Sequence, residues 1–250
     1  MTQAGLFVLA VLLTLNMGLV VPQAAAEPKK ITKCTTITEP GSYLLDKSLT
    51  AVGTCIVVAA DFVTLDLDGQ TLTGDGTGAG VNDSGVHHEG TVVKNGTIRG
   101  FANGVDLFAS STGQVERVRA FLNSQHGIRV GSDFTISGNN ANGNLTAGIV
   151  AGNGSTISGN NASSNRDGIG AGNDSTISGN TASNNNDDGI AAGNNSTISG
   201  NTASDNTGIG IRVSACAVNS ASNIYGNTAQ NNTGGDTSSL TDCVTSHNSF

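Results

Sequence analysis

The chain has 250 residues, a formal net charge of −8 and only 12% charged residues. Glycine contributes 35 residues and tryptophan none, a composition typical of turns and short strands. The negative charge argues against nucleic acid or an anionic membrane as partner, because both require a basic surface. Disorder is not expected, because Ile, Val and Ala recur in register along the chain.

Residues 1–26 have the features of a secretory signal. They carry no charge, include an apolar run over 6–15 and end in three alanines before Glu27. We therefore expect cleavage after Ala26 and a secreted or periplasmic protein. No Lys or Arg precedes the apolar run, so an uncleaved anchor is the alternative. No second apolar stretch follows, and no other membrane contact is expected.

The four cysteines agree with export. Cys34 and Cys55 flank the first turn of the repeat region, and Cys216 and Cys243 flank the last. Of the three possible pairings, we expect the two local ones, Cys34–Cys55 and Cys216–Cys243. Such disulfides would close terminal coils that lack a neighbour on one side.

One phrase, Thr-Ile-Ser-Gly-Asn, occurs four times between residues 132 and 215. Its central isoleucines are 21, 20 and 21 residues apart, at Ile136, Ile157, Ile177 and Ile198. This period is too short for helix-pair repeats and matches one coil of a β-solenoid. Within each strand Ile is expected to point inward, and the flanking Thr and Ser outward.

Alignment of the repeats gives three apolar positions per coil and hence three short strands per coil. The predicted fold is all-β: a single right-handed parallel β-helix of eight coils, with a cap and first coil at 27–62, coils over 63–232 and a cap or tail at 233–250. The aligned sets are Leu67/Leu72/Val81, Val93/Ile98/Val105, Val115/Ala120/Ile128, Ile136/Ala141/Ile149, Ile157/Ala162/Ile169, Ile177/Ala182/Ile190, Ile198/Ala203/Ile211 and Ile224/Ala229.

Two columns of asparagines are predicted at the corners between strands. Asn tolerates a left-handed backbone, and its side-chain amide can bond the equivalent amide one coil away, so both columns are interpreted as structural ladders. The first contains Asn139, Asn160, Asn180, Asn201 and Asn227, and the second contains Asn123, Asn144, Asn165, Asn185, Asn206 and Asn232.

The early coils carry more charge than the late ones. The alignment places Asp68, Lys94 and Glu116 on one outward column, and Asp106 beside Arg129 on another. Opposite charges on adjacent strands contribute about 0.2–1 kcal/mol each, which explains this pattern without a site.

Four early segments, together with the Asn-rich coils, carry a family resemblance. They are Cys34-Thr-Thr-Ile-Thr-Glu-Pro-Gly-Ser-Tyr-Leu-Leu, Cys55-Ile-Val-Val, Val63-Thr-Leu-Asp-Leu-Asp-Gly-Gln-Thr-Leu-Thr-Gly and Lys94-Asn-Gly-Thr-Ile-Arg-Gly-Phe. Over residues 34–232 the chain resembles the secreted right-handed parallel β-helix repeat proteins, which include pectate lyases, polygalacturonases, alginate epimerases and periplasmic NosD-type proteins. The resemblance implies the fold but no single reaction, because many members share these segments and have no assigned activity.

The catalytic motifs of the enzymatic members are incomplete in this chain. Polygalacturonases combine Asp residues with Gly-His-Gly and Arg-Ile-Lys, whereas this chain has only Asp187-Asp188 and an isolated His126-Gly. Pectate lyases bind calcium with outward carboxylates and use an Arg as the base. In this chain the late coils offer only Asp167 and the Asp187-Asp188 pair near one corner, and Arg166 is the single basic residue beside them. The Asp-Pro-His-Asp segment of alginate epimerases is absent, since Pro occurs only at positions 22, 28 and 40.

Asp66 and Asp68 are the candidate metal ligands. They flank an inward leucine, so both carboxylates are expected on one face about 7 Å apart. Asp75, Asp83 and Glu89 follow in the longer loop of that coil. Grouped hard oxygen ligands suit Ca²⁺, which is the only cofactor we consider. The alternative is that these residues are solvated turn and ladder positions.

Asp106, His126 and Arg129 are the candidate catalytic residues. His126 and Arg129 offer a general base and a cation on one strand, and Asp106 from the coil before would orient Arg129. If the protein cleaves or epimerises a uronan, we expect the site on this face. His87-His88 lies in an insertion between coils; adjacent histidines on a strand seldom point the same way, so an exposed polar loop is expected there.

The outward Thr and Ser residues of the repeats form a flat array. It is similar to the Thr-x-Thr arrays of ice-binding β-solenoids, although Ser in place of the second Thr removes a methyl group at every coil. The array would also serve as small, soluble outward strand positions. Its members are Thr135, Thr156, Thr176, Thr197, Ser137, Ser158, Ser178 and Ser199.

No complete catalytic set is found, whereas a long solenoid face follows from the fold. We therefore expect a non-catalytic, monomeric scaffold of carbohydrate-interacting type, with a polysaccharide or cell-surface glycan as partner. The alternative is a calcium-dependent lyase, hydrolase or epimerase acting on acidic polysaccharide. Aromatic platforms for sugars are scarce: of two Tyr and seven Phe, we expect Phe101 and Phe121 to be exposed.

Overall fold

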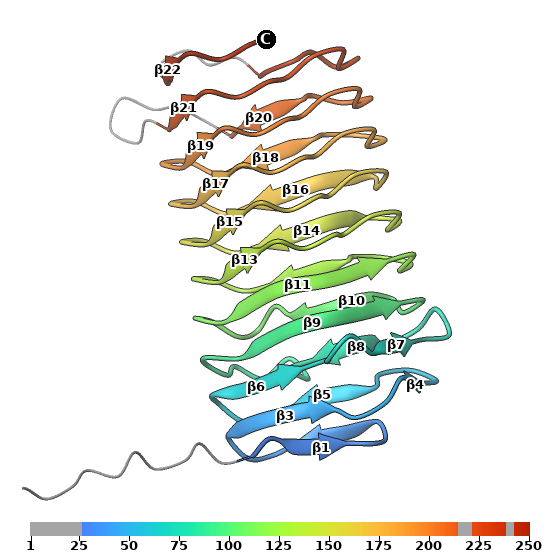
Figure 1. Ribbon diagram of the computed structural model, residues 1–250. Helices are drawn as coiled ribbons and strands as arrows, with labels where there is room; N and C mark the ends of the chain where they lie inside the picture. The colour runs from blue at the N-terminus through green and yellow to red at the C-terminus, as the bar shows by residue number, and fades with distance from the viewer. Residues whose placement is uncertain (1–26, 215–221, 239–242) are drawn as a thin grey trace, which may run out of the picture.

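The computed structural model describes residues 27–214, 222–238 and 243–250, whose strands stack as the coils of a parallel β-helix (Figure 1). Each strand pairs in parallel with its equivalent in the next coil, from β1 at one end to β22 at the other. Parallel connections are right-handed, so the fold is the predicted right-handed parallel β-helix. None of these residues forms a helix long and apolar enough to cross a membrane.

The strands form two sheets, of 13 and nine strands. The 13-stranded sheet contains β1 (Lys29–Ile31), β3 (Gly41–Leu45), β4 (Leu49–Thr50), β6 (Val63–Asp66), β7 (Thr71–Thr73), β9 (Val92–Arg99), β11 (Gln114–Phe121), β13 (Thr135–Ser137), β15 (Thr156–Ser158), β17 (Thr176–Ser178), β19 (Thr197–Ser199), β21 (Asn223–Tyr225) and β22 (Val244–Ser246). The nine-stranded sheet contains β2 (Thr35–Ile37), β5 (Ile56–Val58), β8 (Ala79–Asn82), β10 (Asn103–Leu107), β12 (Ile128–Val130), β14 (Ala147–Ala151), β16 (Asp167–Ala171), β18 (Ile190–Ala192) and β20 (Ile211–Val213).

The solenoid has about ten turns, where the sequence predicted eight. The additional turns come from β1 to β5 and from β22, which stack on the counted coils at the two ends (Figure 1). The aligned apolar sets ran from Leu67 to Ala229, so the count did not include the turns beyond them.

The second of the three predicted strands is very short in the later coils. It consists there of isolated bridges between successive coils, from Arg119↔Asn140 to Thr228↔Ser249. In the earlier coils the first and second strands merge into the eight-residue strands β9 and β11. Each later coil therefore presents two extended sides and one angular side.

The core is a set of aliphatic columns running along the solenoid. The isoleucines of the repeated phrase have no exposed surface, whereas Thr156 and its equivalents point outward. Full burial of an isoleucine stabilises a fold by about 1.5–3 kcal/mol, but burial here requires the coils on either side. The central column contains Ile136, Ile157, Ile177, Ile198 and Ile224.

Both asparagine ladders are confirmed. In the first ladder, the Nδ2 of Asn160 donates to the Oδ1 of Asn180 and to the carbonyl of Ile136, both at 2.9 Å. The Oδ1 of Asn160 accepts from the backbone N–H of Asn139 at 2.9 Å and from its Nδ2 at 3.0 Å. One buried side chain therefore satisfies donors and acceptors of two neighbouring coils.

The ladders extend further than the sequence indicated. The first continues to Asn248, whose Oδ1 accepts from Asn227, and the second ends on Asp236, whose Oδ1 accepts from Asn232 at 2.9 Å. A third, exposed ladder was not predicted. There the Oδ1 of one Asn accepts the backbone N–H of the next, along Asn153, Asn173 and Asn194.

The predicted disulfide between Cys34 and Cys55 is present, with a Cα–Cα distance of 4.5 Å. It joins the start of β2 to the start of β5 and closes the first turn of the nine-stranded sheet. Cys216 lies outside the described residues, so its pairing with Cys243 stays a prediction, as does cleavage of the leader at Ala26.

Replacement of Asn160 by alanine tests the ladder. The variant leaves the N–H of Asn139 and the carbonyl of Ile136 buried without their partner, so we expect the free energy of unfolding to fall by about 1–3 kcal/mol. The matched control is Thr156→Ala, which changes an exposed side chain of the same coil. Urea denaturation measures both, and equal midpoints for the two variants would contradict the proposed role of the ladder.

Candidate functional site

The outward side chains of the nine-stranded sheet change in charge and size along the solenoid. Strand register places six residues from six successive coils on one outward column. Charged side chains occupy both ends of this column, and small side chains occupy its middle. In order, the residues are Asp106, Arg129, Val150, Gly170, Ala191 and Arg212.

The small middle residues form the floor of a hollow of about 340 Å³, here called the acid–arginine groove. A Cβ added at Gly170 would meet no atom within 4 Å, so open space lies above the floor. Thr146, Ala147 and Ile169 complete the lining. The polar side chains around this floor are His126, Arg166, Asp167, Asp187, Asp188 and Arg212.

Two ion pairs order the groove wall. The Nε of Arg212 lies 2.5 Å from the Oδ2 of Asp188, and the other oxygen of Asp188 accepts the N–H of Ile209 at 2.9 Å. The Nε and Nη2 of Arg166 each lie 3.2 Å from the Oδ2 of Asp167. Both guanidinium groups are thus held beside carboxylates and stay accessible from solvent.

Arg129 and Asp106 lie next to this groove, one and two coils respectively before its floor. Their Oδ2 and Nη1 are 3.6 Å apart, and the Nδ2 of Asn103 donates to the same carboxylate oxygen at 2.9 Å. The guanidinium of Arg129 also lies over the ring of Phe108, 4.2 Å from its centroid. The predicted neighbours Asp106 and Arg129 are therefore brought together.

His126 stands at the end of the groove nearest to Arg129. Its Nδ1 is buried and has no hydrogen-bond partner, while its backbone N–H donates to the Oδ1 of Asn103. Burial lowers the pKa of His126 below its ordinary value of 6.5, and the positive charges of Arg129 and Arg166 lower it further. An imidazole with a depressed pKa is uncharged at neutral pH.

The pKa values of two carboxyl groups are shifted in the opposite direction. Burial raises the pKa of Asp106, against the opposing effect of Arg129. Burial also raises the pKa of Asp167, where Arg166 opposes the shift and the charges of Asp187 and Asp188 add to it.

Sequence reasoning missed most of the groove. The corner group of Arg166, Asp167 and Asp187-Asp188 was noted but not assigned to a site, and Arg212 was not noticed. A signal was present: Arg166-Asp167-Gly and Asp187-Asp188-Gly occupy equivalent positions in successive coils. Strand register was needed to place Arg212 opposite Ala191 and beside this corner.

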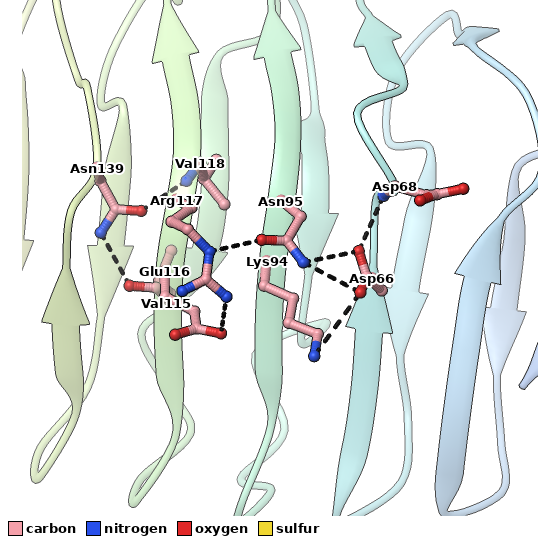
Figure 2. Close-up of polar contacts among 9 residues, drawn as sticks. All are labelled: Asp66, Asp68, Lys94, Asn95, Val115, Glu116, Arg117, Val118 and Asn139. Carbon is pink, nitrogen blue, oxygen red and sulfur yellow. Dashed lines mark hydrogen bonds and ion pairs between the residues drawn. The ribbon is translucent and has the colours of Figure 1, made fainter.

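The predicted pair Asp66 and Asp68 lies at the end of β6 in the 13-stranded sheet (Figure 2). The groove, in contrast, lies on the nine-stranded sheet. The carboxylate of Asp66 accepts from Asn95 Nδ2 at 3.1 Å and lies 3.7 Å from Lys94 Nζ. The Asp68 carboxylate points away from these partners, and its backbone N–H donates to Asp66. Binding of Ca²⁺ by this pair stays a prediction.

The predicted charge column of Asp68, Lys94 and Glu116 is right for Lys94 and Glu116 and wrong for Asp68. Lys94 pairs in register with Asp66 and Glu116, not with Asp68. The alignment used Leu67 as the equivalent of Val93, whereas Leu65 is the true partner, because Asp68 and the glycine after it adopt positive φ and add a bulge after β6. Glu116 instead pairs with Arg117 at 2.8 Å (Figure 2).

His87 and His88 do not converge on one point. The Nε2 of His87 lies 3.0 Å from the hydroxyl of Ser111, and the Nδ1 of His88 lies 3.2 Å from the Oδ1 of Asp61. Each imidazole thus binds a different neighbouring segment, in agreement with the expectation of a polar loop.

The expected exposure of Phe101 is also wrong. Phe101 has no exposed surface, and a Cβ added at Gly74 would meet its ring at 2.5 Å. Because Gly74 has no side chain, the ring of Phe101 can pack against its backbone inside the solenoid. Phe121 is half-buried, and the aromatic ring that is exposed near the groove is Phe108.

Fold and sequence pattern together define an extracytoplasmic right-handed parallel β-helix protein. Residues 63–241 match the family described as "Periplasmic copper-binding protein (NosD)", and the chain belongs to this family. The family's periplasmic description confirms the expected extracytoplasmic location. No curated protein sequence matches the chain.

Solved structures with a similar fold include polysaccharide-modifying enzymes. The periplasmic alginate epimerase AlgG is 18% identical, with a TM-score of 0.54 over 81% of this chain and 61% of AlgG. Pectate lyase Pel9A is 15% identical over 88% of this chain and 72% of its own, with a TM-score of 0.48. The chain spans about three fifths of AlgG, and at these identities the likeness concerns the fold.

The family description raises the question of copper. Copper prefers imidazole nitrogens and the sulfurs of Cys and Met. Within residues 27–214, 222–238 and 243–250, no three His, Cys, Asp or Glu side chains gather as a metal-binding group. His87 and His88 bind separate partners, and Cys34 and Cys55 are disulfide-bonded. This part of the chain does not fit a copper centre.

The depressed pKa of His126 predicts a specific pH dependence of stability. The unfolded chain takes up this proton near pH 6.5 and the folded chain only at lower pH. Stability from this group is therefore complete above pH 6.5 and is lost as the pH falls toward the folded-state pKa. Urea midpoints between about pH 8 and pH 5 measure the loss.

His126→Asn should lack this part of the pH dependence. Gln125→Asn, which changes an exposed and non-titrating neighbour of His126, is the matched control and should keep the pH dependence of the unchanged chain. An unaltered pH profile in His126→Asn would contradict the assignment.

Proposed function

We propose that the protein is a non-catalytic, extracytoplasmic scaffold that binds a carbohydrate in the acid–arginine groove. The observation that carries this proposal is the hollow of about 340 Å³ over Gly170, bordered by the ion pairs Arg166–Asp167 and Arg212–Asp188. A ligand site of this type combines an open, mainly apolar floor with a few fixed polar groups.

The chemistry of the groove suits sugar hydroxyls. A hydroxyl donates one hydrogen bond and accepts others, and each acid–arginine pair presents an acceptor and several donors side by side. The floor of Val150, Ala191 and Gly170 offers apolar surface to the C–H face of a sugar ring. The structural similarity to AlgG, an alginate epimerase, supports the proposal that a protein of this fold binds carbohydrate.

A non-catalytic role is favoured because two of the three carboxylates of the groove are engaged. Asp188 is held by Arg212 and a backbone N–H, and Asp167 is held by Arg166. A general acid or base needs an accessible proton position within hydrogen-bond reach of the reacting group. Binding needs only the fixed donors and acceptors that these pairs supply.

The second candidate function is a lyase, hydrolase or epimerase acting on an acidic polysaccharide. One observation favours it: burial and the charges of Arg129 and Arg166 lower the pKa of His126, so the imidazole that lines the groove is uncharged and able to act as a base. In this reading His126 would remove a proton, Arg129 would offset the negative charge of the substrate, and Asp106 would orient Arg129.

Calorimetric titration with a panel of plant and microbial polysaccharides and their oligomers tests binding. Gly170→Leu fills open space above the floor without a steric conflict at Cβ, so we expect about a tenfold or greater loss of affinity, equivalent to about 1.4 kcal/mol or more. Thr176→Leu, at an exposed position on the other sheet, is the control and should bind normally. Equal affinity in both variants would remove the groove as the site.

The same panel, with and without Ca²⁺, separates binding from catalysis. Ultraviolet absorbance of unsaturated products, analysis of reducing ends and NMR of sugar configuration report lyase, hydrolase and epimerase activity respectively. Turnover that is lost in Arg129→Ala would establish the second candidate. Turnover that persists undiminished in Arg129→Ala would exclude Arg129 from the chemistry.

A further inference from the structure

We propose that the acid–arginine groove selects uncharged, hydroxyl-rich glycans over uronans. This inference rests on the proposed binding function and names its ligand class. It follows from the number of charges in the groove, from the way in which its arginines are already paired and from the layout of its donors and acceptors.

The groove carries more acidic than basic groups. Three carboxylates line it, those of Asp167, Asp187 and Asp188, against the two guanidiniums of Arg166 and Arg212. His126 adds no positive charge near neutral pH, because its pKa is lowered. A chain with a carboxylate on every sugar would therefore enter a site whose formal charge has the same sign. Juxtaposed like charges disfavour a partner strongly.

Both arginines in the groove are already paired with a carboxylate. Arg212 lies 2.5 Å from a carboxylate oxygen of Asp188, whose side chain is only 11% exposed, and Arg166 lies 3.2 Å from Asp167. A uronate that bound the outer nitrogens of Arg212 would lie close to the negative charge of Asp188, and one that took the place of Asp188 would leave that carboxylate buried without its partner. Removing one partner of a buried ion pair is unfavourable.

A vicinal diol of a neutral sugar can bind without breaking an ion pair or adding a like charge. One hydroxyl can donate to the carboxylate of an ion pair while its neighbour accepts from the guanidinium, and the ion pair stays intact. Charge-assisted hydrogen bonds of this kind are about twice as strong as neutral ones. The exposed carboxylate of Asp187 supplies a further acceptor at the same corner.

The test compares matched oligomers. Calorimetry on the purified protein uses neutral β-1,4-linked gluco- and manno-oligosaccharides against mannuronate and galacturonate oligomers of equal length, at fixed ionic strength. We expect the best neutral oligomer to bind about tenfold or more tightly than any uronate. Tighter binding of a uronate would overturn the selectivity and leave groove binding intact. Binding of neither class would overturn the proposed function, and this inference with it.

Two variants test the physical cause. Asp187→Asn removes an exposed negative charge, and Asp188→Asn releases Arg212 from its partner. Both should raise uronate affinity severalfold, and Asp188→Asn should also weaken binding of the neutral oligomer. Asp174→Asn, at an exposed corner outside the groove, is the control and should change neither. Unchanged uronate affinity in Asp187→Asn, whose position imposes little on folding, would overturn the electrostatic argument.

Discussion

The hydrogen bonds between equivalent asparagines of successive coils are the constraint on which the structure depends. A coil of this solenoid turns through tight corners in which backbone N–H and C=O groups would be buried without partners. The side chain of Asn160 reaches both the coil before it, at Asn139, and the coil after it, at Asn180. Because the ladders join successive coils from Asn123 and Asn139 onward, the corners of these coils stay in register, and the isoleucine columns inside are aligned by the same contacts.

That alignment explains why the outward positions can vary. Inward residues must stack on identical neighbours, whereas an outward residue contacts mainly solvent and the residue one coil away. The 13-stranded sheet uses this freedom for a uniform Thr and Ser surface, and the nine-stranded sheet uses it for the acid–arginine groove. The groove is formed where Gly170 and Ala191 replace larger side chains between Arg129 and Arg212, so five coils contribute to one site without a change in the backbone.

The sequence predicted the repeated features well, because repetition exposes which positions are equivalent. Both ladders, the inward isoleucines and the pairing of Asp106 with Arg129 follow from one alignment. The Cys34–Cys55 disulfide follows from the position of its two cysteines at the first turn. The errors lie where the repeat is irregular. A bulge at Asp68 shifted one charge column, and the space left by Gly74 for the ring of Phe101 depends on packing between coils. The groove could not be predicted, since its side chains come from corner and strand positions whose proximity only the register reveals.

The division between inner ladders and outer groove has a functional consequence. An ion pair such as Arg212–Asp188 adds little to a fold that the ladders already hold, since partly exposed ion pairs contribute at most modestly to stability. Such a pair instead fixes the position of donors and acceptors before a ligand arrives, which lowers the entropy lost on binding. Substitutions in the outward columns can therefore change what this solenoid binds at small cost to its stability, whereas substitutions in the ladders change stability first. This separation accounts for similar β-helices carrying different sites on one architecture.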